Sequence, residues 1–148
     1  MEMRTVLLPT DFSQDAESAC QQGFALATRA HARILLLHVL RTNFVWRDTP
    51  LPMREQLEHE MRIEAEQRLR LLAASQEGPV ETLVLWGHPA VVICHVAAEQ
   101  EVDLIVMSTH GRSGHDRWVY GSVADKVLRH ADVPVLLVRS YAGQKVTA

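Results

Sequence analysis

The sequence predicts an α/β fold in which an open, parallel, five-stranded sheet carries helices on both faces. Five short apolar runs recur along the 148 residues, and stretches with helical spacing of apolar residues separate them. Four of the runs are nearly unbroken aliphatic sequences, as expected for strands that are covered on both faces. Strands that alternate with helices at this spacing indicate a parallel sheet, and right-handed crossovers leave few topologies.

The predicted strands are residues 6–8, 34–39, 80–86, 104–107 and 135–138. The third run differs from the others, because Glu81 interrupts it and its apolar residues partly alternate with other residues. Partial alternation is typical of a strand that is less completely covered. We therefore expect this strand to lie near an edge of the sheet.

Two long helices are predicted in the first half of the chain. The first, between the first two strands, has small and apolar residues at helical spacing: Ala16, Ala19, Cys20, Gly23, Phe24 and Ala27. The second runs from about Met53 to Ser75, with an inner stripe of Leu57, Met61, Ala65, Leu69 and Leu72. Three pairs with the acid four residues before the base predict its solvated face: Glu58–Arg62, Glu64–Arg68 and Glu66–Arg70. We expect the longest loop outside the glycine-rich segment at residues 40–52.

Two further helices are predicted in the second half of the chain. Residues 89–100 contain several β-forming valines, but Pro89 suits a first helical turn and a crossover is needed there, so we predict a helix. The last helix begins at Ser122, which together with Asp125 resembles a capping box. Arg129 and His130 lie in its last turn, where the helix dipole favours basic residues.

Composition and charge exclude several classes of protein. Hydrophobic residues make up 47% and charged residues 22%, the balance of a soluble globular chain. Fifteen basic against eighteen acidic residues give a net charge of −3, so we expect no general nucleic-acid binding. No apolar stretch approaches the roughly 20 residues that cross a bilayer. We expect one domain over residues 1–148, with a frayed tail at 141–148.

The cysteines and the first residues predict a cytoplasmic protein. Cys20 and Cys94 lie far apart in the sequence and neither has a neighbouring cysteine, as is common for reduced thiols. Both fall on predicted helices among apolar residues, so we expect them in the core. The apolar run that follows Arg4 is too short for the core of a signal peptide.

The segment between the fourth strand and the last helix is the strongest candidate for a ligand site. Three of the seven glycines, Gly111, Gly114 and Gly121, fall there. Glycine lets a backbone approach a ligand closely, and a helix start presents unpaired N–H groups, so the segment could hold phosphate. The alternative is a glycine-rich loop that only reverses the chain. The spacing matches neither the Walker motif nor the dinucleotide fingerprint.

Two aspartates have different expected roles. Asp11 follows the first strand and either caps the first helix or faces the edge where ligands bind in open parallel sheets. In the second position its carboxylate could accept ribose hydroxyls or help to hold Mg²⁺. Asp103 precedes the fourth strand, so it should lie at the opposite end of the sheet and share no site with Asp11.

The remaining candidates carry weaker signals. The eight histidines form no pair or cluster with the spacing of a zinc site. His110 could contact phosphate or fix the loop, whereas His38 ends a buried strand and is expected to be a core residue. A Ser–His–Asp triad from Ser113, His115 and Asp116 is not expected, because neighbours in sequence rarely converge in that geometry.

Four segments of the sequence resemble the universal stress protein family. They read VLLPTDFS at 6–13, LIVMSTHGRSG at 104–114, GSVADKVLRHA at 121–131 and PVLLV at 134–138. The resemblance covers essentially the whole chain in one register. It implies a Rossmann-like sheet, similar to that of adenine nucleotide α hydrolases, in the order 3-2-1-4-5 with two helices on each face. It also implies a homodimer through the edge strand from Val135 to Val138.

The same resemblance implies ATP as a ligand, with Mg²⁺. ATP-binding members of the family resemble the pattern Gly-x2-Gly-x9-Gly-Ser/Thr, which Gly111, Gly121 and Ser122 match, while Ser108 stands at the first glycine. By resemblance the triphosphate would be lined by Gly111, Arg112, Gly114, Gly121, Ser122 and Val123, with Ser108 and His110 beside it. Pro9, Thr10, Val39 and Met107 would frame the adenine and ribose, and Asp11 would serve the ribose or the metal.

Three functional hypotheses follow from these residues. The first is a cytoplasmic, dimeric module that binds ATP, hydrolyses it slowly or not at all, and signals to protein partners that the sequence does not name. The second is a weak ATPase or an autophosphorylating protein with Ser122 or Ser113 as the acceptor. The third is a family member that binds no nucleotide and acts through dimer contacts alone.

Overall fold

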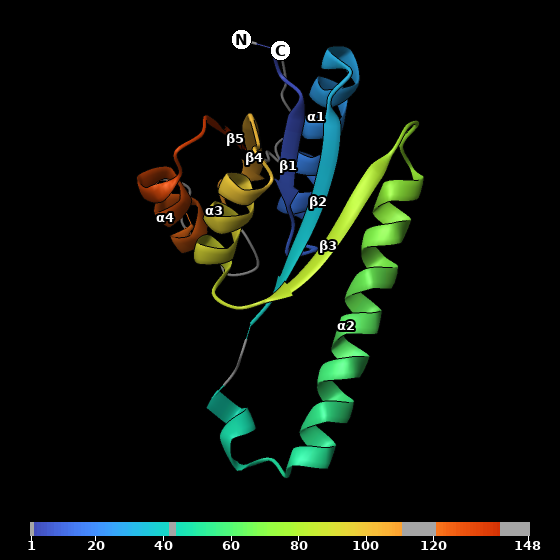
Figure 1. The fold of residues 1–148 in the computed structure, drawn as a ribbon, viewed down its shortest axis with the longest axis vertical. Coiled ribbons are helices and arrows are strands. Elements are labelled where there is room, and N and C mark those ends of the chain that lie inside the picture. Colours follow the sequence, from blue (N-terminus) through green and yellow to red (C-terminus); the bar gives the residue numbers. More distant parts are fainter. Residues whose placement is uncertain (1, 42–43, 111–120, 140–148) are drawn as a thin grey trace, which may run out of the picture.

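The computed structural model describes residues 2–41, 44–110 and 121–139 and contains a parallel sheet in the order β3-β2-β1-β4-β5 (Figure 1). The strands are β1 (Thr5–Pro9), β2 (Arg33–Leu40), β3 (Val80–Trp86), β4 (Leu104–Ser108) and β5 (Val135–Val138). The helices are α1 (Gln14–Ala30), the short 3₁₀ helix η1 (Phe44–Asp48), α2 (Leu51–Ala74), α3 (Pro89–Glu99) and α4 (Ser122–His130). The predicted fold class, strand order and edge position of β3 are confirmed.

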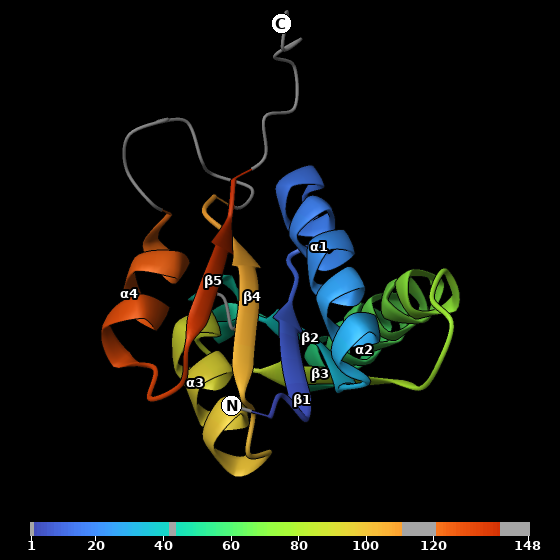
Figure 2. The ribbon, with the colours of Figure 1, turned by 90° about the horizontal axis from the view of Figure 1, so that it is seen from above.

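The helices cover the two faces of the sheet in pairs, α1 with α2 on one face and α3 with α4 on the other (Figure 2). Successive side chains of a strand point to opposite faces. Leu8 and Leu36 therefore pack under α1 and α2, whereas Leu7 and Leu35 pack under α3 and α4. All four leucines are fully buried, which explains why their strands appear in the sequence as continuous apolar runs.

Helix α2 begins earlier than predicted and projects beyond the sheet. It starts at Leu51, and η1 occupies part of the segment that was predicted as a loop at residues 40–52. The first turns of α2 extend past the carboxyl edge of the sheet (Figure 1), so Leu57, predicted in the buried stripe, is 39% exposed. Within the described ranges, no helix has both the length and the apolar character needed to cross a membrane.

The predicted ion pairs along α2 form in one case out of three. Arg70 Nη2 lies 3.7 Å from Glu66 Oε2, as predicted. Arg62 instead donates a hydrogen bond of 2.9 Å to the carbonyl of Val84, because the helix turns this position toward β3. Arg68 lies over the ring of Phe12 and not beside Glu64. A spacing of four residues on a helix makes an ion pair possible, but groups on other elements can bind the same arginine side chain instead.

The predicted capping box of α4 does not form. Gly121 is the N-cap residue, and among the described residues no side chain caps the helix start. Ser122 is the first residue inside the helix, so its hydroxyl is not placed to cap it. The Asp125 carboxylate pairs with Arg129, with Nε 3.1 Å from Oδ2. No described side chain therefore caps the backbone N–H groups in the first turn of α4.

The side chain of Asp103, just before β4, is hydrogen-bonded to the backbone at the start of β1. Its Oδ2 atom accepts the backbone N–H groups of Arg4 at 2.8 Å and Thr5 at 2.9 Å, next to the start of β1. These two hydrogen bonds hold the pKa of the carboxyl below its ordinary value. The prediction that Asp103 lies at the opposite end of the sheet from Asp11 is confirmed.

Replacing Asp103 should change the pH dependence of stability. The charged carboxylate has a folded-state pKa below the ordinary value of about 3.9, so it stabilises the fold above that pH and stops doing so as the pH falls through the folded pKa. We expect Asp103→Asn to lower the free energy of unfolding in urea at pH 7. The difference from the unmodified protein should shrink below about pH 4. A difference of constant size from pH 7 to pH 3 would contradict this role.

Gly23 allows α1 to pack closely on β1. A Cβ atom at this position would overlap the Cδ2 atom of Leu8, which is fully buried in the core. We expect Gly23→Ala to reduce the free energy of unfolding by about 1–3 kcal/mol. In a Leu8→Ala background most of that cost should disappear, because the clashing atoms are gone. Strictly additive effects in the double-mutant cycle would show that the two residues do not conflict.

Candidate functional site

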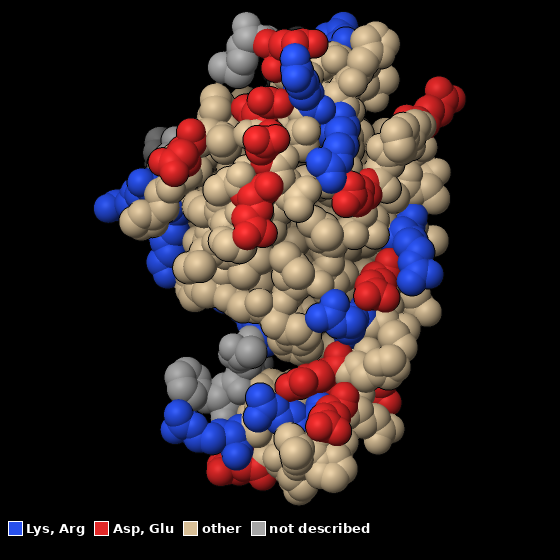
Figure 3. Space-filling model, viewed as in Figure 1, with Lys and Arg blue, Asp and Glu red and all other residues tan. Residues whose placement is uncertain are grey.

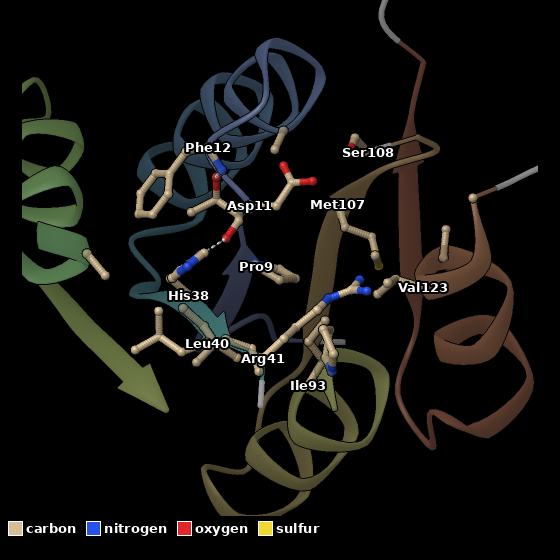
Figure 4. A pocket seen from close by; sticks show the side chains of 18 of the residues that line it. Pro9, Asp11, Phe12, His38, Leu40, Arg41, Ile93, Met107, Ser108 and Val123 are labelled. Carbon is tan, nitrogen blue, oxygen red and sulfur yellow. Dashed lines mark hydrogen bonds between the residues drawn. The ribbon is translucent and has the colours of Figure 1, made fainter. Parts of the chain in front are cut away.

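A cavity of about 760 Å³ opens at the carboxyl edge of the sheet, where β1 and β4 are neighbours (Figure 4). The chain leaves β1 through α1 toward β2 on one side, whereas it enters β4 from α3 on the other side. Connections that diverge in this way leave a crevice beyond the strand ends, which is the usual ligand position in open α/β sheets. Residues of all three central strands and of α2, α3 and α4 line the cavity.

Ten of the thirteen residues predicted for the site line this one cavity. They are Pro9, Thr10 and Asp11 at the end of β1, Val39 in β2, Met107, Ser108 and His110 around the end of β4, and Gly121, Ser122 and Val123 at the start of α4. The other three, Gly111, Arg112 and Gly114, lie outside the described residues, as do Ser113, His115 and Asp116. Segments more than 100 residues apart in the sequence therefore meet at one edge.

The turn between β1 and α1 is held by its own polar side chains. Phe12 has a φ angle of 65°, a left-handed conformation that is uncommon for a residue with a side chain. The hydroxyl of Thr10 accepts the N–H of Phe12 at 3.0 Å, and Oδ1 of Asp11 accepts the N–H of Ser13 at 2.9 Å. Ser13, and not Asp11, caps α1 by accepting the N–H of Ala16. The turn thus places Asp11 at the cavity wall.

His38 is a buried residue that also lines the cavity. It is only 9% exposed, and its Nδ1 atom lies 2.8 Å from the carbonyl oxygen of Thr10. A carbonyl can only accept, so Nδ1 carries the proton. The ring of His38 lies 4.4 Å from that of Phe12 (Figure 4). The guanidinium of Arg68, on α2, lies 4.1 Å from the centroid of the Phe12 ring. The prediction of a satisfied core histidine is confirmed, but its place in the cavity wall was not predicted.

The end of β4 is tied to β5 and to α4 through Thr109. The N–H of Thr109 donates to the carbonyl of Val138 at 3.2 Å, and its carbonyl accepts the N–H of Gly121 at 2.6 Å. Ser108 donates its hydroxyl hydrogen to the carbonyl of His110 at 2.7 Å, and the ring nitrogen Nδ1 of His110 lies 3.0 Å from the Thr109 hydroxyl. The ring of His110 thus contacts a neighbouring side chain of the loop, and its predicted contact with phosphate stays a prediction.

The start of α4 brings hydrogen-bond donors and a partial positive charge to the cavity wall. The N–H of Asp125 is the first to bond within the helix, to the carbonyl of Gly121. The N–H groups of Ser122, Val123 and Ala124 therefore have no helical partner, as in the first turn of any helix. Ser122 and Val123 line the cavity. The carboxylates that share its wall are Asp11 and Glu64, and the arginines are Arg41 and Arg68.

The two faces of the sheet give the cavity two chemically different sides. Pro9, Val39 and Met107 belong to the face under α3 and α4, where Ile93 also lines the cavity, and this side is apolar. Phe12 and His38 belong to the face under α1 and α2. Period-two alternation from Val39 could have identified Arg41 as a lining residue. Arg68 and Met61 on α2 carried no such signal, because their contact depends on how α2 packs.

Neither cysteine is placed for redox chemistry. Cys20 is fully buried, as predicted, and burial raises the pKa of its thiol to about 12, although a hydrogen bond with Thr10 acts in the other direction. Cys94 is only partly buried, so the prediction of a core position was wrong in degree, and partial burial also raises the pKa of its thiol. Within the described ranges, no group of three or more histidine, cysteine or acidic side chains is arranged to hold a metal ion.

Comparison with known proteins gives consistent matches. The profile of the universal stress protein family matches residues 2–139. A universal stress protein of Thermus aquaticus is 32% identical over 139 residues, which cover 92% of this chain and 98% of that protein. The solved structure of MJ0577 from Methanocaldococcus jannaschii has a TM-score of 0.85 and 26% identity, and covers 95% of this chain and 98% of its own.

A universal stress protein crystallised in complex with cAMP has a TM-score of 0.69 to this chain. The match covers 93% of this chain and 98% of that one, at 20% identity. At this identity the likeness concerns the fold.

Proposed function

This chain belongs to the universal stress protein family, and we propose that it is a regulatory module that binds ATP, or another adenine nucleotide, at the carboxyl edge of its sheet. The observation that carries the proposal is that ten residues, predicted from four separate segments, line one cavity. Its volume of about 760 Å³ falls in the usual range of small-ligand sites, roughly 300–1,000 Å³.

The start of α4 is the proposed site for the phosphates. Gly121 has no side chain, and no other side chain in the described part of the chain caps the helix, so the first-turn N–H groups can bind an anion. Donors and the positive end of the helix dipole then act at the same place. Ser122, the first residue of the helix, is exposed and adds a hydroxyl donor.

The apolar side of the cavity is the proposed site for the base. Pro9, Val39 and Met107 end three neighbouring strands and face the same side of the sheet. We call these three residues, together with Ile93, the base slot. The structure of this fold in complex with cAMP is consistent with an adenine nucleotide, although that likeness extends to the fold alone.

Asp11 is placed to serve the ribose or a magnesium ion. Its carboxylate lines the cavity at the end of β1, and one oxygen accepts the N–H of Ser13. Mg²⁺ commonly binds to one or two carboxylates together with the phosphates of the nucleotide. When bound, the ion would neutralise phosphate charge, and Asp11 would hold it beside the ribose.

Binding rather than turnover is the activity that the described residues favour. His38 donates a hydrogen bond from Nδ1 to the carbonyl of Thr10, and the ring of His110 contacts the Thr109 hydroxyl. Both rings therefore help to hold the cavity wall in place. We therefore propose at most slow hydrolysis or phosphoryl transfer to Ser122. Single-turnover measurements with the purified protein distinguish this slow chemistry from none.

ATP should stabilise the protein, and Asp11→Asn should weaken its effect. Asparagine can still accept the N–H of Ser13, so the turn is kept while the negative charge is lost. Loss of one charge-assisted hydrogen bond should weaken ATP binding about 10- to 100-fold. Thermal unfolding with and without ATP and Mg²⁺ measures this. At ATP a hundredfold above Kd the unmodified protein should gain about 2.7 kcal/mol, and an unchanged Tm would contradict nucleotide binding.

We further propose that the protein is a homodimer joined through its β5 edges. β5 is an edge strand, and Leu136 on it is 40% exposed. An uncovered apolar edge tends to pair with another strand. We expect Leu136→Asp to shift the protein to monomers in analytical ultracentrifugation, because the charge would be buried in the interface. Leu71→Asp, at a position on α2 that is 76% exposed, is the matched control and should leave the dimer intact. Equal sedimentation of both variants would argue against this interface.

A further inference from the structure

Arg41 directly follows β2 and lines the cavity on the side of the base slot. Alternation along β2 places Leu37 and Val39 on the face under α3 and α4, and residue 41 continues that series. Figure 4 shows the Arg41 side chain extending from the end of β2 across the pocket, toward the side where Met107 and Val123 lie. Its guanidinium therefore reaches into the cavity on the side of the base slot.

The base slot offers a flat ligand no aromatic partner among the described residues. Its walls are aliphatic or contain sulfur, and Ile93 and Met107 are 2% and 6% exposed. Three described aromatic rings line the cavity outside the base slot. Phe12 and His38 lie on the other face of the sheet and contact each other at a tilt of 34°, and the ring of His110 contacts the Thr109 hydroxyl. On the side of the base slot, the guanidinium of Arg41 is a planar group that can lie against a flat ligand.

The guanidinium of Arg41 is available to a ligand. Arg41 makes no hydrogen bond or ion pair with the described part of the chain. By contrast, Arg62 is held by the carbonyl of Val84, and Arg68 lies over the Phe12 ring. Arg41 is an exposed residue, so water solvates its guanidinium and a bound ligand can take the place of that water.

We propose that Arg41 stacks on the purine ring of the bound nucleotide and closes the base slot over it, an inference that rests on the proposed nucleotide function. A guanidinium is planar and more weakly hydrated than an ammonium group, so it stacks well on aromatic faces. A cation over a ring face is also attracted to it electrostatically. Arg41 thus determines affinity for the base, while the start of α4 holds the phosphates.

Stacking on the base and contact with a phosphate give opposite patterns of affinity. A side chain that touches only the base contributes equally to the binding of adenosine, AMP and ATP. A side chain that pairs with phosphate contributes little to adenosine and most to ATP, and its contribution falls as salt is added. Calorimetric titration of these three ligands therefore separates the two roles.

The experiment compares the unmodified protein with Arg41→Ala and Arg41→Lys. We expect Arg41→Ala to weaken all three ligands by a similar factor, about 5- to 10-fold. Arg41→Lys keeps the charge but not the planar group, so it should recover only part of the loss. Arg29→Gln removes one positive charge from the last turn of α1, at the far end of the sheet, and should leave binding unchanged.

Each outcome decides the proposal. If Arg41→Ala leaves all affinities unchanged, or if the loss grows with the number of phosphates, stacking is wrong while nucleotide binding stands. If Arg41→Lys binds as tightly as the unmodified protein, the planar group is not what matters and stacking is again wrong. If the unmodified protein binds none of the three ligands, the nucleotide function fails and this inference fails with it.

Discussion

The cavity depends on the separation of β1 from β4 before either strand ends. The two strands pair only at Val6–Leu104 and Leu7–Ile105, whereas β1 and β2 stay paired over five residues. Pro9 has no N–H to give to a neighbouring strand, and the N–H of Thr10 bonds to the carbonyl of Leu37 in β2. The chain therefore follows β2 away from β4, and the space between the two strand ends becomes the pocket.

The strands and most helices could be predicted from the sequence because burial on both faces leaves continuous apolar runs and helices show their period. The strand order needed the family resemblance, since spacing alone does not distinguish among right-handed topologies. Leu57 and Arg62 were misplaced for one reason: their surroundings come from how α2 lies against and beyond the sheet. The predicted cap of α4 was wrong because Ser122 matches a capping pattern, whereas the helix already begins one residue earlier with Gly121 as its N-cap.

Site residues could be predicted where a single segment of the sequence shows the pattern. They could not be predicted where side chains from different elements meet only in the folded structure. Asp11 and the start of α4 follow strand ends, which can be located from the sequence. The contact of Phe12 with His38, and of Arg68 with Phe12, joins the turn after β1, strand β2 and helix α2. None of these three segments shows a sequence pattern that predicts it. Arg41 lies between these cases, because alternation places it but only the structure shows that its side chain crosses the pocket.

The surface around the pocket agrees with a site that is open at one end. The part of the chain with η1 and the first turns of α2 extends beyond the sheet, and a notch separates it from the body of the molecule (Figure 3).

The most direct test of the proposed nucleotide site is a crystal structure of the protein grown with ATP and Mg²⁺. The expected density has the base against Val39 and Met107 and the phosphates at the first N–H groups of α4. A nucleotide bound outside this cavity, or a cavity without nucleotide at saturating ATP, would contradict the proposed site.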